Sequence, residues 1–495
     1  MRINRRKLLH AGLAMTAGYV SSASANEPNQ PNSGTNQESS VKPSYGAGNT
    51  GLGITKQLAE FLSQISYKQL SDKTIHETKR ATLDWMGCAI SGAKHPTPQI
   101  LISSMQEMGS APTSTVLGQG NLRLSMLDAA VANGQMGHVL DFDDTHLGGV
   151  ILHTSTATIP ALLALGEHYH SSGQNFMTAI VAAFEAGIRT GQAMPSHHLG
   201  GWHLTGSLGT IASAAAAAKL RQANPQQMLH ALGIACTQAA GMQQNRGSDC
   251  KSFHAGKSAY HGVLSAMLAM KGFNSSPEIL EGNLGFTKIY SKTQDLSKVT
   301  ADFGMPWMID GNGYKPYACG VVLHPLIDAV IKLSKTSQIN PNEVAVLEVF
   351  VHPDVIRITG VDSPGSGLMS KFSANHAAAV AYNDQAGGVL QFSNEKSKDP
   401  KIQALRKLIQ VKPLPSFRLD QAMAELKTIH GKVFTAQIEH ASGTVSNPMS
   451  DQDLERKFIG NTQTILGKSK TQQAIKTIWA LESVKDIRNV IRIFA

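Results

Sequence analysis

The sequence predicts a mainly α-helical protein, in which a large all-helical domain built from both chain ends carries a smaller, inserted α+β domain. Three observations lead to this fold class. Apolar residues recur at intervals of three and four from about residue 55 to about residue 290, which is typical of helices. Between about 311 and 445, segments with the alternation of β-strands occur among further helical segments. After Ser450 the helical pattern returns, so the α+β region is predicted to interrupt the helical domain.

The first part of the helical domain is predicted to span residues 53–310. The segment Ala214–Ala218 is dense in alanine, which favours helix and lets neighbouring helices approach closely. β-Branched residues, which favour strands, are few in this part. The helices expected from the periodicity cover residues 55–65, 74–92, 97–107, 122–140, 156–170, 174–193, 206–222, 225–243 and 256–272.

The α+β domain is predicted to span residues 311–445. Residues 344–351 are strand-like and end at a His-Pro pair, and residues 432–439 alternate with a period of two before a Ser-Gly turn. Residues 446–495 are predicted to complete the helical domain, with helices from Asp451 onward. The helices expected between the two strands cover residues 325–337, 374–382 and 401–410.

Length and composition limit the class of protein. The chain has 495 residues, enough for two to three domains with their own cores. A hydrophobic content of 42% excludes a wholly disordered chain. Beyond the N-terminus no stretch of about 18 apolar residues lacks charge, so we expect no stable membrane insertion. Four cysteines are too few for a disulfide scaffold, and whether Cys236 and Cys250 pair stays open.

The first 25 residues have the features of an export signal. Four basic residues precede a modest apolar run from Leu8 to Val20, and an A-x-A cleavage site ends at Ala25. The segment Asn4–Leu9 resembles the twin-arginine signal, which directs the export of folded proteins. We therefore expect interaction with the twin-arginine export machinery, cleavage after about Ala25 and a periplasmic location. An uncleaved anchor is the alternative, although about 13 apolar-rich residues span a bilayer poorly.

The export signal also carries much of the positive charge. It holds four cations and no acidic residue, so its removal lowers the formal net charge of +9 to about +5 over roughly 470 residues. No run of lysine and arginine with interleaved aromatic residues occurs, so binding to nucleic acid is not expected. Residues 26–52 are rich in Asn, Ser, Gly, Gln and Pro, which predicts a disordered linker.

Three histidines lie just before predicted helix starts: His153, His203 and His324. A helix N-terminus carries about +0.5 of an elementary charge and free N–H groups, so it attracts anions and disfavours a protonated imidazole. Together with Lys251 and Lys315, these histidines suggest a polyanionic ligand such as a di- or tricarboxylate. For each histidine alone, a hydrogen-bonded polar residue near a helix cap is the alternative interpretation.

Lys251 and His254 form a further pair. They are three residues apart, so they share one face if the segment is helical. A solvated surface pair explains this spacing as well as a binding site does, and the spacing alone leaves their role open.

The densest group of ionisable residues lies between His138 and His146, where three aspartates and two histidines occur within nine residues. Such a group suggests metal ligation or acid–base chemistry. The spacing lacks the H-E-x-x-H and C-x-x-C patterns of zinc sites and the glycine and glutamate of an EF-hand. No metal site is therefore predicted, although calcium binding through Asp141 and Asp143 stays conceivable. An aspartate crowded by like charges can have a raised pKa and transfer protons.

Taken together, five segments of the chain resemble the MmgE/PrpD family, which includes 2-methylcitrate dehydratase, cis-aconitate decarboxylase and iminodisuccinate epimerase. The similarity runs from about Leu58 to the C-terminus, nearly the whole mature chain. Five motifs in order and with appropriate separations make the resemblance specific. They are Leu140–Thr145 (LDFDDT), Gly201–Gly206 (GWHLTG), Lys251–Gly256 (KSFHAG), Lys315–Gly320 (KPYACG) followed by His324-Pro325, and Ser446–Ser450 (SNPMS) followed by Lys457-Phe458.

The resemblance implies a helical domain built from both chain ends, an α+β lid, an active site between them and, usually, a homodimer. Cys319 lies near a position that is histidine in some decarboxylases, and this difference bears on which reaction the protein catalyses. On this basis we assign catalytic roles to Asp141, His153, His203, Lys251, Lys315 and His324, and substrate contacts to Thr145, His254 and Cys319.

The chemistry that the family shares is proton transfer at a carbon next to a carboxylate. The enediolate that forms has to be stabilised by cations or hydrogen-bond donors, a role for Lys251 and Lys315. Asp141 or His153 would act as the base. We therefore expect a lyase that needs no cofactor and acts on a small di- or tricarboxylic acid. Elimination of water, as in 2-methylcitrate dehydratase, is the first hypothesis.

Dehydration also needs an acid, and a protonated His203 or His324 would assist the loss of hydroxide. Two other reactions of the family stay open. A decarboxylase loses carbon dioxide instead of water and reprotonates the allylic carbanion. An epimerase returns the proton to the other face and would use Cys319 as a second acid or base, although a small buried thiol is the simpler interpretation of this residue. A non-catalytic periplasmic protein that binds carboxylates is the alternative outside the enzymes.

Overall fold

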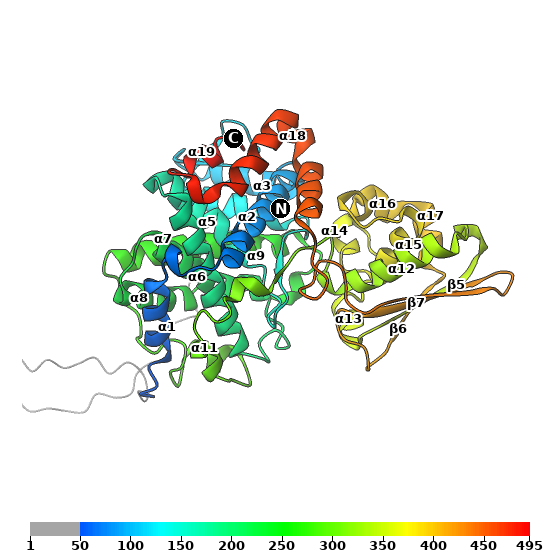
Figure 1. Ribbon diagram of the computed structural model, residues 1–495, viewed down its shortest axis with the longest axis horizontal. Helices are drawn as coiled ribbons and strands as arrows, with labels where there is room; N and C mark the ends of the chain where they lie inside the picture. Colours follow the sequence, from blue (N-terminus) through cyan, green and yellow to red (C-terminus); the bar gives the residue numbers. More distant parts are fainter. Residues whose placement is uncertain (1–49) are drawn as a thin grey trace, which may run out of the picture. The chain divides into compact units, whose positions relative to one another are not determined.

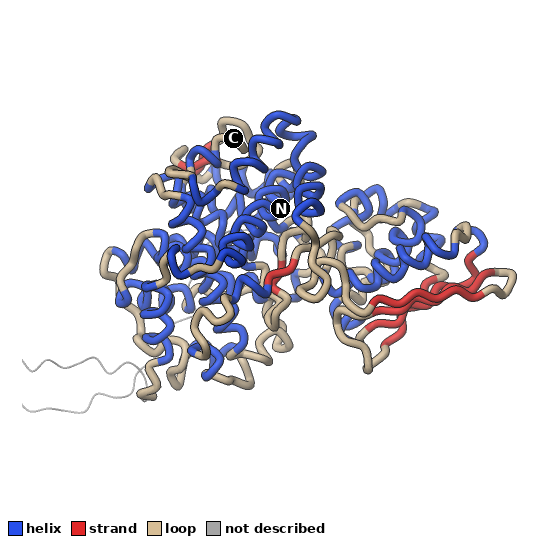
Figure 2. The backbone as a smooth tube through the Cα atoms, viewed as in Figure 1, coloured by secondary structure: helices blue, strands red, loops and turns tan. Residues whose placement is uncertain are grey.

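Residues 50–495 are described by a computed structural model, and they form a mainly helical structure with few strands (Figure 1, Figure 2). The predicted export signal and residues 26–49 of the predicted linker lie outside the described residues. Within residues 50–495, none of the helices is long and apolar enough to cross a bilayer. All four cysteines are free thiols, with Cys236 buried and Cys250 exposed, so these two are not paired.

Each of the nine helices predicted for the first part is present. The largest differences lie at two ends: α8 stops at Cys236 rather than at 243, and α9 starts at Asp249 rather than at 256. The first turn of α9 is polar, so apolar periodicity alone does not detect it. The helices are α1 Ile54–Gln64, α2 Asp72–Gly92, α3 Pro96–Glu107, α4 Met126–His138, α5 Thr154–Tyr169, α6 Gly173–Gln192, α7 Leu204–Leu220, α8 Pro225–Cys236 and α9 Asp249–Met270.

The alanine-rich helix α7 forms the centre of the helical part. Every residue from Leu204 to Ala218 is buried, and α7 packs against α5, α6, α8 and α9. A helix without a polar face belongs in a core. Glycine permits similarly close packing elsewhere. A Cβ at Gly137 in α4 would lie 2.2 Å from Trp85 Nε1 in α2, so a larger residue would push these helices apart.

A four-stranded sheet with the strand order β6-β5-β7-β8 dominates the second part of the chain (Figure 1). β5 pairs parallel with β6 and antiparallel with β7, and β7 pairs antiparallel with β8. α12 packs against β7, β8 and α15, while α15 also packs against β6. The elements are α12 His324–Ser337, β5 Val344–Val351, α15 Ala374–Asp384, α17 Pro400–Arg406, β6 Ile409–Pro413, β7 Ala422–Thr428 and β8 Val433–Ile438.

The strands β5 and β8 and the three helices of this part confirm the predicted elements, with two corrections. The helix predicted for residues 401–410 ends at Arg406, and its last residues belong to the strand β6. The strand β7 was not predicted, because its alanine, glutamate and lysine residues favour helix locally. Burial alternates along β7 all the same, so tertiary packing decides its conformation.

The remaining elements are short. They are the strands β1 Ser114–Thr115, β2 Arg123–Leu124, β3 Thr145–His146 and β4 Asn312–Gly313, and the helices α10 Phe286–Tyr290, α11 Ser297–Thr300, α13 Pro353–Ile358, α14 Gly367–Ser370, α16 Asn394–Lys398 and α19 Arg488–Ile491. β1 pairs with β2, and β3 pairs with β4, both antiparallel.

The long helix α18, Asp451–Trp479, packs against α2, so the end of the described chain contacts its beginning. Gly467 interrupts α18 with a φ of 80°. Lys457 joins the two helices to the segment after α4, because its Nζ donates to Asp84 Oδ1 and to the carbonyl oxygen of Phe142, each at 2.6 Å. Within residues 50–495, one hydrophobic core lies among the helices and another surrounds the sheet, and Phe142 belongs to the second.

Candidate functional site

The candidate site lies in the segment that joins α4 to α5. His138 ends α4, and Asp141 then takes the left-handed conformation with a φ of 50°, which aspartate tolerates better than most residues. β3 follows and pairs with β4, so that Thr145 lies opposite Gly313. This pairing brings Lys315, two residues further along the chain, within hydrogen-bond distance of Asp141.

Two lysines flank the Asp141 carboxylate. Lys251 Nζ, from the first turn of α9, donates to Oδ2 at 2.8 Å, and Lys315 Nζ donates to Oδ1 and to the Asp141 backbone oxygen. Burial alone would raise the pKa of Asp141, but the two ammonium groups hold it well below its usual range. Burial lowers the pKa of Lys251, whereas for Lys315 pairing with Asp141 outweighs burial and raises the pKa. Asp141 is therefore ionised, and the three groups keep a net positive charge.

A third lysine, Lys371, lies beside them. It stands just before α15 and is almost fully buried. Its Nζ donates to the carbonyl oxygens of Leu140 and Ala318, each at 2.7 Å, so it contacts the segment that carries Asp141. Burial lowers the pKa of Lys371 to about 8. No feature of the sequence singles this lysine out, and the sequence analysis missed it.

Three of these charged groups, Asp141, Lys251 and Lys371, line a small cavity. Its walls come from both parts of the chain, among them His138, Asp141, Lys251, Leu368, Lys371 and Phe372. The cavity has a volume of about 10 Å³, roughly the room for one water molecule. The positive groups therefore converge on a common space that is nearly closed in this structure.

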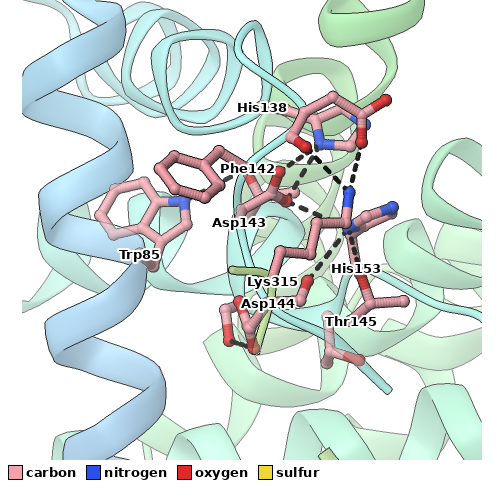
Figure 3. Close-up of polar contacts among 12 residues, drawn as sticks. Trp85, His138, Phe142, Asp143, Asp144, Thr145, His153 and Lys315 are labelled. Atoms are coloured by element: carbon pink, nitrogen blue, oxygen red, sulfur yellow. Dashed lines mark hydrogen bonds and ion pairs between the residues drawn. The ribbon is translucent and has the colours of Figure 1, made fainter. Parts of the chain in front are cut away.

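Asp143 holds two histidine rings, as Figure 3 shows. His138 Nδ1 lies 3.0 Å from both carboxylate oxygens, and His153 Nδ1 lies 3.3 Å from Oδ2. Burial acts against ionisation, but the two rings hold the pKa of Asp143 well below its usual range. His153 Nδ1 also lies 3.0 Å from the Asp144 carbonyl oxygen and from Thr145 Oγ1. Both rings therefore direct Nδ1–H toward the protein, which leaves each Nε2 with a lone pair.

The two Nε2 atoms differ in their partners. His138 Nε2 accepts a hydrogen bond from Lys251 Nζ at 3.1 Å, and burial lowers the pKa of this ring to about 4. His153 Nε2 has no hydrogen-bond partner among residues 50–495. His153 is thus held in position at one nitrogen and free to react at the other.

His138, Asp143 and His153 place their ligand atoms within 4.8 Å of one another, a geometry that can hold a metal ion. The hydrogen bonds favour another interpretation. A ring nitrogen that donates to the Asp144 carbonyl has no lone pair for a metal, and the His153 Nδ1 atom is in this position. We interpret the group as a carboxylate that orients two imidazoles.

Asp144 holds the segment between α4 and α5 in place through hydrogen bonds. Its Oδ2 accepts hydrogen bonds from Ser155 Oγ at 2.6 Å and from Asn312 Nδ2 at 2.7 Å. Burial and the neighbouring Asp84 raise the pKa of Asp144 to about 8. The raised pKa that crowding leads us to expect in this run therefore occurs at Asp144, while Asp141 and Asp143 stay ionised.

The three histidines predicted at helix starts lie there. His153 and His203 occupy the N-cap positions of α5 and α7, and His324 is the first residue of α12. Neither His153 nor His203 makes a capping hydrogen bond through its side chain. Burial is the main cause that lowers the pKa of His203 far below its usual value and that of His324 to about 3, so both rings are neutral.

The other predicted residues surround this centre. His203 Nδ1 lies 3.0 Å from His254 Nδ1, and the His203 ring lies 5.8 Å from the His138 ring. Burial lowers the pKa of His254 to about 4. Cys319 is fully buried, and burial raises the pKa of its thiol. Its thiol is therefore protonated at neutral pH, and it does not line the small cavity.

The charge of Lys371 leads to a prediction about pH. Because its pKa is about 8, the ammonium form is present at pH 7 and is largely lost at pH 9. We expect the affinity for propane-1,2,3-tricarboxylate to fall about tenfold between these values, since only the charged lysine attracts a carboxylate. Titration calorimetry measures this affinity directly.

Two controls separate Lys371 from other groups. Lys257 has a pKa that burial also lowers to about 8, but it donates to the Ala240 carbonyl and does not line the cavity, so Lys257→Met should keep the pH step. Asp144→Asn tests the buried carboxyl that titrates near the same pH. The step should disappear in Lys371→Met, and a full step in that variant would assign it to another group.

Comparisons with known proteins point in one direction. Residues 56–298 match the model of the MmgE/PrpD N-terminal domain, and residues 317–483 match that of the MmgE/PrpD C-terminal domain. The chain is 26% identical to cis-aconitate decarboxylase of Homo sapiens over 88% of its own length and 92% of the relative's. It is also 26% identical to cis-aconitate decarboxylase of Aspergillus terreus, over 90% of its own length and 96% of the relative's.

Proposed function

Because the chain belongs to the MmgE/PrpD family, we propose that it is a cofactor-independent lyase for a di- or tricarboxylic acid, and that it decarboxylates a tricarboxylate of the cis-aconitate type. The observation that carries this proposal is that Lys251 and Lys371 line one nearly closed cavity together with Asp141, whose carboxylate Lys315 contacts from outside the cavity wall. Relatives named for this reaction align with nearly the whole chain.

The charge balance of the cavity suits a polyanion. Lys251 and Lys315 share the single negative charge of Asp141, and the Lys371 ammonium group has carbonyl oxygens as its hydrogen-bond acceptors and no carboxylate partner among residues 50–495. Burying ammonium groups costs free energy, which an anionic ligand recovers because it pairs with them at low dielectric constant. Carboxylates of the substrate would lie against these lysines.

The reaction needs one proton and no other reactant. An allylic carboxylate leaves as carbon dioxide, and the electrons of the broken bond form a new double bond. The electron pair of the existing double bond moves onto the far carbon as a carbanion. That carbon, next to a second carboxylate, takes up the proton, so a tricarboxylate trianion and one proton give a dicarboxylate dianion and carbon dioxide. The developing enediolate is stabilised by the lysines.

His153 is the side chain best placed to transfer this proton. Asp143 and the Asp144 carbonyl fix the Nδ1 side of the ring, and Nε2 is free of protein partners among the described residues. His153 Nε2 takes up a proton from water through its lone pair and then delivers it to the substrate carbon as the general acid, while Asp143 faces the resulting imidazolium. Lys251 and Lys315 bind the carboxylates.

Dehydration, the first hypothesis from the sequence, requires an additional catalytic group at the site. It requires a proton donor for the departing hydroxide, and the sequence suggests a protonated His203 or His324 for this purpose. Burial lowers the pKa of both rings so far that neither carries a proton to donate at neutral pH. Decarboxylation releases no hydroxide, and its one proton reaches carbon from His153, so it does not depend on His203 or His324 as donors. We therefore rank it before dehydration.

The proposal also includes a lid and an assembly. The cavity of about 10 Å³ is smaller than a tricarboxylate, and its walls come from both parts of the chain. Substrate entry therefore requires the part that contains the sheet to move away as a lid. From the sequence we further propose a homodimer that the twin-arginine machinery exports to the periplasm.

Proton NMR in D₂O tests this function. Mature protein is mixed separately with cis-aconitate, 2-methylcitrate, malate and amino-dicarboxylic acids. We expect cis-aconitate to give the signals of a terminal alkene, with deuterium at the reprotonated carbon and evolution of carbon dioxide. A new alkene from 2-methylcitrate without carbon dioxide would identify a hydro-lyase instead. Deuterium exchange without an alkene would identify an epimerase, and binding without any reaction would leave a carboxylate-binding protein.

A further inference from the structure

A pair of histidines lies at the proposed site, and the proposed mechanism gives neither of them a role. His203 and His254 are both buried, and their Nδ1 atoms lie 3.0 Å apart. Burial is the main cause that lowers the pKa of both rings, so both are neutral. A neutral imidazole has one N–H group and one lone pair, so one of the two Nδ1 atoms donates to the other. The contact therefore holds a single proton.

The backbone fixes this contact. His203 is the N-cap residue of α7, and its backbone N–H donates to the Gly241 carbonyl at 2.9 Å. His254 lies in the second turn of α9, against the same two segments. A Cβ at Gly241 would lie 3.3 Å from His254 Nδ1, and a Cβ at Gly206 in α7 would lie 3.2 Å from His254 Cβ. The two glycines therefore leave the room that lets the His254 ring meet the His203 ring.

The other nitrogen of His203 is free to meet a ligand. His203 Nε2 has no hydrogen-bond partner among residues 50–495, and unlike His324 Nε2 it is not closed off from solvent. The His203 ring lies 5.8 Å from the ring of His138, which lines the small cavity. Burial and, next, the charge of Lys251 lower the pKa of His203, so the ammonium group is close to this ring. A carboxylate that Lys251 binds is therefore in reach of His203 Nε2.

The histidines of the site differ in the partner of Nδ1. The Nδ1–H groups of His138 and His153 face Asp143, so each Nε2 has a lone pair and cannot donate while its ring is neutral. A carboxylate accepts hydrogen bonds and donates none. Of these three rings, His203 alone can offer an N–H to a carboxylate without first taking up a proton. It can do so when its Nδ1 accepts from His254.

We propose that His254 is a positioning residue, whose Nδ1–H donates to His203 Nδ1 and thereby directs the Nε2–H of His203 to a carboxylate of the ligand. His203 then acts as a neutral hydrogen-bond donor that keeps its proton throughout the reaction. This inference rests on the proposed function, because the ligand is the polycarboxylate that Lys251 binds. It replaces the substrate contact that the family resemblance implies for His254 by a role through His203.

Nitrogen-15 NMR reads the two tautomers directly. Protein labelled with ¹⁵N-histidine is saturated with propane-1,2,3-tricarboxylate at pH 7, and the signals are assigned with the variants His203→Phe and His254→Leu. We expect the proton of His203 on Nε2 and the proton of His254 on Nδ1. A proton on His203 Nδ1 would overturn the proposal, even if cis-aconitate is decarboxylated.

Titration calorimetry with the same tricarboxylate tests whether His254 acts through His203. His254→Leu should weaken binding about tenfold, since a hydrogen bond to a charged group contributes about that much or more. His254→Asn should recover most of this loss, because its amide N–H lies close to the place of the histidine Nδ1–H. In the His203→Phe background, His254→Leu should cause no further loss. Losses that add fully in the double variant would overturn the positioning role.

His261→Leu is the matched control. His261 lies further along the same helix α9, burial lowers the pKa of its ring to about 4 as well, and it bonds to Gln238 rather than lining the cavity. This variant should bind the tricarboxylate within about twofold of the wild type.

The outcomes separate the role of His254 from the reaction. The expected tautomers and non-additive losses in a protein that turns over no acid would support this role and reject the proposed function. Decarboxylation of cis-aconitate by a protein in which His254→Leu binds as tightly as the wild type would support the function and overturn the role.

Discussion

Replacing His153 by glutamine is expected to lower kcat by about 10²–10⁴-fold, the usual contribution of a positioned general acid or base. The amide of glutamine can still donate to the Asp144 carbonyl, which now accepts from His153 Nδ1 at 3.0 Å. It cannot carry a proton to the substrate. We therefore expect KM and the melting temperature to change little, because binding by the lysines and the packing around Asp143 are kept.

The measurement compares steady-state decarboxylation of cis-aconitate by the wild type, His153→Gln and a matched control. His168→Gln is that control, since His168 lies near the other end of the same helix α5 and is exposed. It should retain wild-type kcat. If His153→Gln keeps kcat within a factor of three and raises only KM, His153 binds substrate and another group delivers the proton.

The helices that position the site are largely predictable because their burial is regular. The starts of α5, α7 and α12 are predicted to within two residues, since a polar or proline-containing start is followed by apolar periodicity. The strand β7 is not predictable in this way. Its alanine, lysine and glutamate residues resemble a helix locally, and only pairing with β5 and β8 makes them a strand.

The site is predictable only in part, for a similar reason. Asp141, Lys251 and Lys315 stand in distinctive motifs, and the structure places them in direct contact. Lys371 is 120 residues or more from the two segments around Asp141 and Lys251, in a stretch without unusual spacing. Only the fold brings it to the Leu140 carbonyl.

The sequence predicts the protonation states of the site residues less well than their positions. The position of His203 at a helix start disfavours a protonated ring, whereas the dehydration hypothesis needs one; in the structure the pKa is lowered, and burial is the largest cause. Sequence also does not distinguish Asp143 from Asp144, which are adjacent. Histidine rings keep the first ionised, whereas burial beside Asp84 raises the pKa of the second to about 8. These differences arise from neighbours that are distant along the chain.

Replacing Lys251 by methionine should weaken the binding of propane-1,2,3-tricarboxylate by about 10²–10³-fold and lower kcat/KM to the same extent. Lys251 Nζ is one of the charges that line the small cavity, and methionine keeps much of the length of the side chain without the charge. Loss of one member of a buried charged pair costs about 2–5 kcal/mol. Asp141 keeps Lys315 as a partner, so the segment after α4 should stay folded.

Lys257→Met is the matched control, because Lys257 lies on the same helix α9 but donates to the Ala240 carbonyl outside the cavity. It should bind the tricarboxylate within about twofold of the wild type, well below the effect of a buried charge. Lys251→Arg separates charge from shape: it keeps the cation, but the planar guanidinium cannot reproduce the contacts with Asp141 and His138. If charge dominates, the arginine variant recovers most of the affinity lost in the methionine variant. Wild-type affinity in Lys251→Met with a lowered kcat would instead place Lys251 in the chemical step, where its ammonium stabilises the enediolate rather than holding the substrate.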